Sequence, residues 1–370
     1  MTPTSFRRAL VPGVAALALA LTACGSDDSG SDAETGSAGD VTVSGQFTIG
    51  GASTQEAAMT AWSVGFADVQ PDAEVTYEPI GSGGGRENFV NGGYALAGSD
   101  AYLDNEEGEL DAAIERCGGE DVLEIPSYIS PIALIFNVDG VDELNLAPET
   151  IAGIFSGEIT QWDADEIAAD NPDADLPSAP INAVHRSDES GTTENFTLYL
   201  TTAVGDAWDE GVFESWPNSY GGTGAQGTSG VVTEVRDGVN AIGYADASQA
   251  GGLGVANVGV GDEFVAPTAE AAAKILEVSE KVEGASDNQL IFELDYTTAE
   301  SGTYPIVLTS YLLACPTYET QEDADFAKSF ASYILSDAGQ EIGSNEAGSA
   351  PLSPTLQEQA QSIIDQISAG

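Results

Sequence analysis

The sequence is organised around one stretch, His185-Arg186-Ser187-Asp188-Glu189-Ser190-Gly191-Thr192-Thr193. Its arginine supplies a guanidinium fork, and the hydroxyls of Ser190 and Thr192 flank a glycine that lets the backbone come close, so these groups suit a tetrahedral oxyanion. The run 194–200 is helix-like, which makes the N–H groups before it unpaired donors of a helix N-terminus, where an anion is favoured. The alternative interpretation is an ordinary helix cap beside a surface ion pair.

Charge makes that arginine unusual. The chain has nine Lys and Arg residues against 61 Asp and Glu residues, a formal net charge of −52. Two of the nine are Arg7 and Arg8, and two other arginines, Arg86 and Arg186, lie in or beside loops rich in Gly and Ser. So acidic a chain is repelled by nucleic acid and by anionic membrane surfaces, which argues against both as partners. The charge predicts high solubility and says nothing about fold.

Residues 1–23 are typical of an export signal. Arg7 and Arg8 precede the apolar run 9–21, which is too short for a membrane span of about 20 residues. Leu21-Thr22-Ala23-Cys24 then resembles the bacterial lipobox, which implies cleavage before Cys24 and lipidation of its thiol. The alternative is an ordinary signal peptide with an incidental cysteine. Residues 24–44 are rich in Gly, Ser and Asp and predict a flexible tether.

Two cysteines remain beyond the signal, Cys117 and Cys315. Outside the cytoplasm such a pair most simply forms one disulfide, which would make the early and late parts of the folded body neighbours. Two unrelated buried thiols are the alternative. His185 is the only histidine, and no Cys or His cluster has ligand spacing, so the sequence predicts no metal and no cofactor.

Strands and helices alternate over residues 45–370, which suits an α/β protein of two lobes. A β-branched run, a loop of small residues and a run with helical spacing follow one another, and the scheme then repeats. The three loops expected from this pattern are 50–54, 81–85 and 97–100, and the strand-like runs before the second and third are 75–80 and 94–96.

Several enzyme templates do not fit. The glycine-rich loop 81–85 lacks the Lys-Ser or Lys-Thr pair of a Walker loop, since the only Lys-Ser pair, Lys328-Ser329, lies in a helix-like run. No G-x-S-x-G motif occurs, and nothing marks His185 as a catalytic base. The sequence therefore predicts that the protein is not an enzyme.

Seven motifs occur in a recognisable order: Gly51-Ala52-Ser53-Thr54, Ile80–Gly85, Ala97–Asp100, Ile154–Trp162, Val184–Thr192, Gly222–Gly227 and Ala241–Tyr244. Together they resemble the phosphate-binding lipoproteins of the ABC-type phosphate-specific transport system, over about residues 45 to 355. The resemblance implies a two-lobed α/β fold, the class II periplasmic-binding-protein fold, with phosphate held by hydrogen bonds in a dry cleft between the lobes.

By position, the resemblance also implies a set of phosphate ligands. Asp188 resembles the family's acid that orients the arginine; as an exposed pair it would contribute little energy, so its expected role is geometric. The family usually has Phe where this chain has Gln55, and because the family uses the backbone N–H there, the bond to the ligand should survive. The implied ligands are Thr54, the backbone of Gln55, Ser82, Asp100, Arg186, Ser190, Gly191 and Thr192.

Two proline-containing extended stretches, Ile125–Pro131 and Gly302–Ile306, are the expected hinge strands of a clamp. They assign residues 45–125 and 301–370 to lobe 1 and residues 126–300 to lobe 2. Both body cysteines then lie in lobe 1, and the first three loops face the Arg186 motif across the cleft.

The predicted protein is a monomeric, lipid-anchored receptor on the extracytoplasmic face of a bacterial cell membrane. It would capture inorganic phosphate and deliver it to an ABC-type phosphate permease. A receptor for another oxyanion, such as sulfate or molybdate, is the alternative of the same class. A secreted phosphoesterase is the alternative of a different class, although the sequence has neither a metal cluster nor an activated nucleophile.

Overall fold

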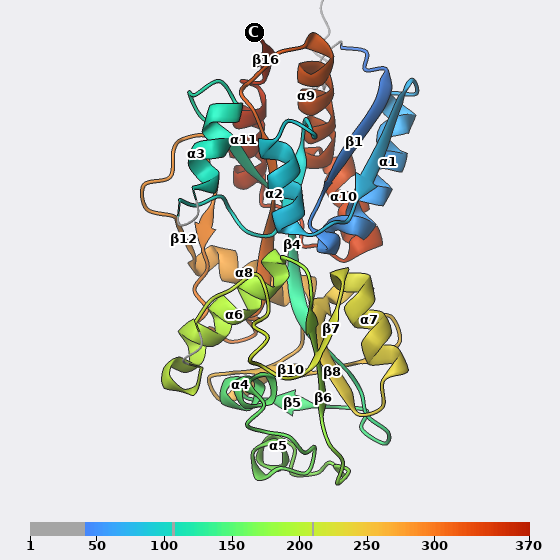
Figure 1. Cartoon of the computed structure of the whole chain (residues 1–370), viewed down its shortest axis with the longest axis vertical. Coiled ribbons are helices and arrows are strands. Elements are labelled where there is room, and N and C mark those ends of the chain that lie inside the picture. The colour runs from blue at the N-terminus through green and yellow to red at the C-terminus, as the bar shows by residue number, and fades with distance from the viewer. Residues whose placement is uncertain (1–40, 106–107, 209–210) are drawn as a thin grey trace, which may run out of the picture. The chain divides into compact units, whose positions relative to one another are not determined.

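Nine strands form the main sheet of this protein, whose computed structural model describes residues 41–105, 108–208 and 211–370 (Figure 1). The strand order is β2-β1-β3-β14-β4-β8-β6-β7, and β9 also pairs with β4. The strands are β1 Gly45–Gly51, β2 Ala73–Glu78, β3 Ala97–Ser99, β4 Leu123–Asn137, β6 Asn182–Arg186, β7 Thr223–Ala225, β8 Ala241–Asp246, β9 Gly254–Val255 and β14 Val307–Ala314.

Helices alternate with these strands along the chain. Within the described ranges, no helix is both long and apolar enough to cross a membrane. The α-helices are α1 Glu56–Val69, α2 Ser82–Val90, α3 Glu109–Arg116, α4 Pro148–Ser156, α5 Asp165–Asp170, α6 Gly191–Val204, α7 Gly227–Asp237, α8 Ala269–Val278, α9 Gln321–Leu335, α10 Asp337–Ala347 and α11 Pro354–Ile364. Shorter elements are the 3-10 helices η1 Ser53–Gln55, η2 Gly205–Ala207 and η3 Ala247–Gln249, and the strands β5 Asn145–Leu146, β10 Asn257–Val260, β11 Glu263–Val265, β12 Glu280–Lys281, β13 Phe292–Glu293, β15 Thr317–Tyr318 and β16 Ser368–Ala369.

The predicted signal peptide (1–23), the predicted lipidation site at Cys24 and the tether up to residue 40 lie outside the described residues. The last four residues of the predicted tether, 41–44, have no regular secondary structure.

Strand β4 connects the two halves of the main sheet (Figure 1). Its first part, Leu123–Pro131, pairs antiparallel with β14, and its second part, Ile132–Asn137, pairs antiparallel with β8. The predicted hinge stretch Ile125–Pro131 therefore lies inside β4, and the other, Gly302–Ile306, leads directly into β14. The proposed lobe boundaries stay a prediction.

Two expectations about the early loops are wrong. Residues 82–85 form the first turn of α2 instead of a loop, because glycine at position 85 lets this turn lie directly against β1: a Cβ there would come within 2.5 Å of the Gly51 Cα atom. Glycine is a poor helix former, which hid the turn from sequence patterns. The strand expected at 94–96 instead spans Ala97–Ser99, where small residues fit between β1 and β14.

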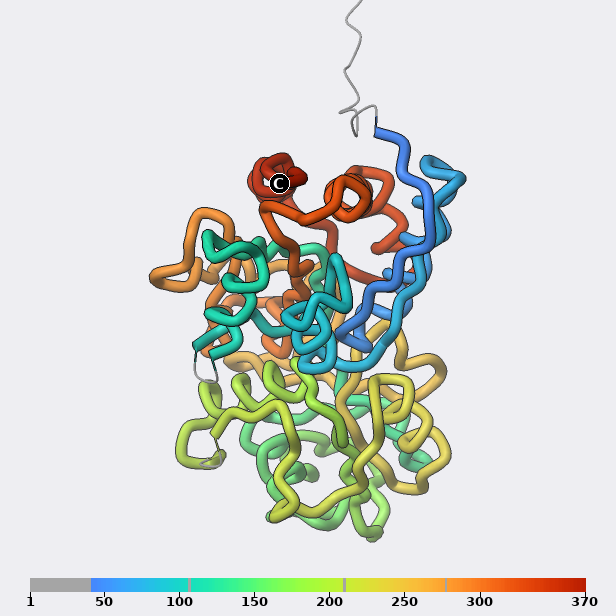
Figure 2. Tube along the Cα trace, turned by 45° about the horizontal axis from the view of Figure 1, so that its top comes forward, coloured from blue at the N-terminus to red at the C-terminus, as the bar shows by residue number. Residues whose placement is uncertain are grey.

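The early and late parts of the chain pack against each other, as the cysteine pair predicts. The ring of Phe47 in β1 stacks on that of Phe326 in α9 with centroids 4.0 Å apart, and Phe66 in α1 contacts Phe330 edge-on at 5.1 Å. Trp62 in α1 donates a hydrogen bond from its indole N–H to the carbonyl of Gly339 in α10 at 2.7 Å. Figure 2 shows the first strand, in blue, beside the orange and red C-terminal helices.

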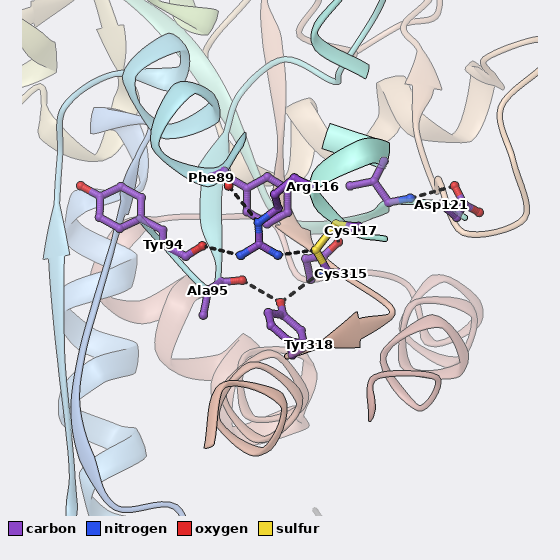
Figure 3. The surroundings of a disulfide bond; sticks show 10 residues. Phe89, Tyr94, Ala95, Arg116, Cys117, Asp121, Cys315 and Tyr318 are labelled. Carbon is purple, nitrogen blue, oxygen red and sulfur yellow. Dashed lines mark hydrogen bonds between the residues drawn. A yellow bond between two sulfur atoms is a disulfide. The ribbon is translucent and has the colours of Figure 1, made fainter. Parts of the chain in front are cut away.

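The predicted disulfide between Cys117 and Cys315 is confirmed and joins the end of α3 to the residue after β14 (Figure 3). The neighbouring Arg116 donates to the carbonyls of Phe89 and Tyr94 at 2.9 and 3.1 Å, and its guanidinium lies 4.6 Å from the centre of the Phe89 ring. The disulfide therefore lies in a packed environment, where it ties residues 198 positions apart.

We expect loss of this disulfide to destabilise the fold, because the unfolded chain regains the freedom that a long closed loop removes. Replacing both Cys117 and Cys315 by Ala should lower the free energy of unfolding by about 2–4 kcal/mol, measured by urea titration. Reductant should destabilise the wild type and leave the double variant unchanged. Two free thiols in the non-reduced wild type, found by mass spectrometry, would contradict the pairing.

Candidate anion-binding site

Most of the predicted ligand residues lie where a strand ends or a helix begins. Thr54 follows β1 in η1, Asp100 follows β3 directly, and Arg186 is the last residue of β6. Strand β1 pairs in parallel with both β2 and β3, and β6 pairs in parallel with β7 and β8. Ligands of open α/β sheets bind at such carboxyl ends of parallel strands, next to helix N-termini that offer free N–H groups.

Asp100 is the hub of the site and is almost fully buried. Its Oδ1 accepts hydrogen bonds from Thr54 Oγ1 at 2.8 Å and Ser310 Oγ at 2.6 Å, and its Oδ2 accepts one from Thr192 Oγ1 at 3.1 Å. The Asp100 N–H donates to Ser82 Oγ at 3.1 Å. This one residue thus joins η1, α2, α6 and β14.

The electrostatics of Asp100 follow from that burial. Burial raises the pKa of its carboxyl above the ordinary value, and the hydroxyl donors Ser310, Thr54 and Thr192, together with the positive charge of Arg186, offset only part of the shift. A carboxyl in this position is suited to accept a hydrogen bond from a ligand that carries a proton.

Arg186 is held by Asp188 in a two-point ion pair. Its Nε and Nη2 donate to the two carboxylate oxygens at 2.8 and 2.5 Å, which leaves Nη1 directed to Thr192 Oγ1 at 3.3 Å. Asp188 also accepts from the N–H of Gly227, the first residue of α7, at 3.0 Å. Burial opposes ionisation of Asp188, but the hydrogen bond and charge of Arg186 outweigh it and lower its pKa.

The expectation that this pair is exposed is wrong. The side chains of Arg186 and Asp188 are 2% and 14% exposed. The backbone of Gly81, the residue before α2, passes close to them: a Cβ on Gly81 would lie 3.0 Å from Asp188 Oδ2. A buried pair of this kind fixes the direction of the guanidinium, so the geometric role predicted for Asp188 stays the interpretation we favour.

The start of α6 has the predicted cap. Ser190 is the N-cap residue, and its Oγ accepts from the N–H of Thr193 at 3.2 Å. Gly191 is the point of closest approach, because a Cβ there would lie 2.8 Å from both Asp100 Cβ and Ser82 Oγ. Thr192, Gly191, Ser82 and Asp100 are therefore brought together from three separate segments.

Gln55 is fully buried, but its groups do not converge on Asp100 in the same way. Its N–H donates to the Ala52 carbonyl at 3.2 Å, and its side-chain Oε1 accepts from Tyr77 Oη at 3.4 Å. Its Nε2 has no hydrogen-bond partner among the described residues. The backbone contact predicted for Gln55 stays a prediction.

Some residues of the site were missed from the sequence. Ser310 bonds directly to Asp100, and Tyr244 Oη accepts from the Arg186 N–H at 3.2 Å and contacts Thr193 Oγ1 at 2.7 Å. Thr309-Ser310 is a pair of hydroxyls inside the otherwise apolar run of β14, and this could have signalled a polar role. In the described part of the chain, no group of three or more His, Cys, Asp or Glu side chains is placed to hold a metal ion.

Comparisons with known proteins agree with this fold. Residues 36–338 match the PBP superfamily domain, so the chain belongs to the two-lobed α/β class of binding proteins expected from the sequence. Phosphate-binding protein PstS2 of Mycobacterium bovis (strain BCG / Pasteur 1173P2) is 34% identical, over 97% of this chain and 98% of that protein. Phosphate-binding protein PstS 3 of Mycobacterium leprae (strain TN) is 32% identical, over 90% and 92%. Within the class, the chain belongs to the PstS family of phosphate-binding proteins.

A solved structure supports the fold independently. The phosphate-bound, high-affinity periplasmic phosphate-binding protein PfluDING has a TM-score of 0.69 to this chain, with 22% identity and coverage of 86% of this chain and 93% of that one. At that identity the likeness concerns the fold alone.

We expect Gly191→Ala to disturb the site through shape alone. The added methyl would overlap Asp100 and Ser82, so the segments must separate, at a cost of about 1–3 kcal/mol in the free energy of unfolding. Gly230→Ala in α7 is the matched control, because its nearest neighbour would be 3.6 Å away, an ordinary contact. That control should be neutral or stabilising by up to about 1 kcal/mol. Equal effects of both changes in urea titrations would refute this account.

Proposed function

We propose that this protein captures inorganic phosphate outside the cytoplasm and delivers it to an ABC-type phosphate importer. The observation that carries the proposal is the connected set Arg186 Nη1, Thr192 Oγ1 and Asp100 Oδ2, in which a guanidinium, a hydroxyl and a carboxylate meet in a buried place. The names of the PstS relatives, which are phosphate-binding proteins, point to the same ligand.

Each group has a distinct part in the proposed binding. Arg186 donates charge-assisted hydrogen bonds, held in direction by Asp188. The hydroxyls of Thr54, Ser82, Ser190 and Thr192 and the N–H groups at the start of α6 donate to the remaining phosphate oxygens. Asp100 accepts the hydrogen bond from a protonated phosphate oxygen. In this arrangement the hydroxyls that now donate to Asp100 turn toward the anion by rotation about a single bond.

Replacing Arg186 by Ala should abolish high-affinity phosphate binding. Loss of the charge-assisted donor in a desolvated site should cost about 2–5 kcal/mol of binding free energy, measured by isothermal calorimetry. Arg236→Ala is the matched control, because Arg236 is an exposed arginine at the end of α7. Phosphate affinity within a few-fold of wild type in Arg186→Ala would show that this arginine does not hold the ligand.

Selectivity separates phosphate from the other oxyanions. Hydrogen phosphate can donate its O–H to Asp100, whereas sulfate is fully ionised near neutral pH and offers only acceptors, so a carboxylate at this place repels it. The acids on the distant surface contribute much less, because their field is screened beyond about 8 Å at physiological ionic strength.

We therefore expect Asp100→Asn to lose discrimination, because an amide can donate to either anion. Wild type should ignore sulfate at concentrations that saturate it with phosphate, and the variant should bind the two anions with more similar affinities. Calorimetry with both anions on both proteins measures this. An unchanged phosphate-to-sulfate preference in Asp100→Asn would place the source of selectivity elsewhere.

The cellular setting is part of the proposal. The sequence pattern at Leu21–Cys24 supports a lipid anchor at Cys24 on the extracytoplasmic face of the cell membrane, with residues 24–44 as the tether. Mass spectrometry of the mature N-terminus checks the lipid. We further propose that the protein acts as a monomer, which light scattering of the soluble body checks.

We also propose that the protein binds phosphate for transport and catalyses no reaction. The relatives are binding proteins by name, and the proposed site holds its ligand with donors and one acceptor, without a metal cluster among the described residues. Turnover of a chromogenic phosphoester would instead favour the phosphoesterase alternative.

A further inference from the structure

A second buried arginine contacts the segments that hold the proposed anion site. Arg86, in α2, is 4% exposed, and its guanidinium binds three partners from three different segments. Its Nη2 donates to Glu214 Oε2 at 2.6 Å, its Nε to Glu109 Oε2 at 2.7 Å and its Nη1 to Ser99 Oγ at 3.3 Å. The proposed function gives none of these side chains a role.

The hydrogen bonds of Arg86 to Ser99 and Glu214 both lead to residues that neighbour or contact a proposed phosphate ligand. Ser99 directly precedes Asp100, and α2 itself begins with Ser82. The carbonyl of Glu214 accepts from the N–H of Ser190 at 3.2 Å, so Glu214 also holds the residue that caps α6. The pair of Arg86 and Glu214 therefore connects the segment of Ser82 with that of Ser190.

A second carboxyl completes this contact. Glu194, in the first turn of α6, faces Glu214, and the two carboxyls act on each other. The Oε1 of Glu214 is buried and has no hydrogen-bond partner among the described residues. Two carboxyl oxygens can share a hydrogen bond only if one of them carries a proton. A proton on Glu194 would give the buried Oε1 of Glu214 the donor that it lacks.

We infer that Arg86, Glu214 and Glu194 form a clasp that positions Ser82 and Asp100 against Ser190 and Gly191 for phosphate binding, without touching the anion themselves. This inference rests on the proposed function. The clasp makes Arg86 and Glu214 positioning residues, since they act through the backbone and through Ser99.

The charges around the clasp explain why it needs the proton. Arg86 faces three acids, Glu109, Glu194 and Glu214, and its single positive charge favours the ionised form of each of them. Asp104 also acts on Glu194, and Tyr102 and Tyr296 lie close enough to interact with it. Burial raises the pKa of both tyrosines, so they stay neutral.

The titration of the two acids follows from their surroundings. Burial, the charge of Glu214 and the hydrogen bond to it raise the pKa of Glu194 to about 9. For Glu214, burial opposes ionisation, but the hydrogen bond and charge of Arg86 outweigh it and lower its pKa. Because the folded-state pKa of Glu194 is raised, its contribution to the assembled clasp is complete below the ordinary glutamate pKa. That contribution is lost as the pH rises through about 9.

The first test compares two carboxylates that bind the same arginine. Glu214→Gln should weaken the binding of inorganic phosphate by about 10- to 100-fold in calorimetry, the range found when partners that orient ligating groups are removed. Glu109→Gln removes the more exposed of the two carboxylate partners of Arg86, 34% against 23% for Glu214. It should change the affinity by less than about threefold, because solvent screens that pair more. Equal losses in the two variants, or a Glu214→Gln affinity equal to that of wild type, would overturn the positioning role.

The second test isolates the proton. Glu194→Gln keeps the shape and the hydrogen-bond donor but cannot ionise. Between about pH 7.5 and 9.5, wild type should lose more phosphate affinity and more thermal stability than Glu194→Gln, while the titration of all other groups is common to both proteins. Identical pH profiles would overturn the clasp.

The stability profile is measured without phosphate and so stands apart from the proposed function. If wild type binds no phosphate, the proposed function fails, and the difference in melting temperature between wild type and Glu194→Gln across the same pH range still decides whether Glu194 holds a proton.

Discussion

The structure depends on the burial of one carboxylate, Asp100, in a chain that already carries a formal net charge of −52. A buried charge is costly unless it is hydrogen-bonded or paired. Asp100 meets this requirement with hydroxyl donors that come from η1, α6 and β14. Because those elements are far apart in sequence, the hydrogen bonds of Asp100 form only when the strand ends and helix starts assemble around it. The same arrangement of donors suits an anion.

The scarcity of cations sets the second constraint. Each of the two buried arginines beside the site is bound to at least one carboxylate, Arg186 to Asp188 and Arg86 to Glu109 and Glu214. Such pairing costs desolvation energy and is weak evidence for stability, but it fixes direction. Arg186 keeps one nitrogen directed toward Thr192, and Arg86 keeps α2 against the segments that hold Asp100 and Ser190. The two arginines therefore fix the positions of neighbouring groups in addition to supplying positive charge.

The sequence predicted the local features of this site and missed the distant ones. The cap at Ser190 and the helix after it depend on neighbouring residues, and the cysteine count sufficed for the disulfide. Thr54, Ser82 and Asp100 came only through the family resemblance, since isolated loops of small residues carry little information. Ser310 contacts Asp100 across 210 positions and Glu214 contacts Arg86 across 128, and no periodicity records such pairs. The burial of Asp188 was missed because it depends on the backbone of Gly81, which is distant in sequence.

Other buried acids follow the same rule as Asp100. Glu124 accepts from the Leu103 N–H at 2.7 Å and from Gln289 Nε2 at 2.6 Å, and burial raises its pKa to about 7. Asp246 accepts from Tyr128 Oη and the Ser248 N–H, and burial raises its pKa to about 6. With so few cations available, this chain surrounds its buried carboxyls with neutral donors and shifts them toward protonation. In that setting Nη1 of Arg186 is the exception, because it donates to the hydroxyl of Thr192 and not to a carboxylate, and in the proposed function this is the direction from which an outside anion is bound.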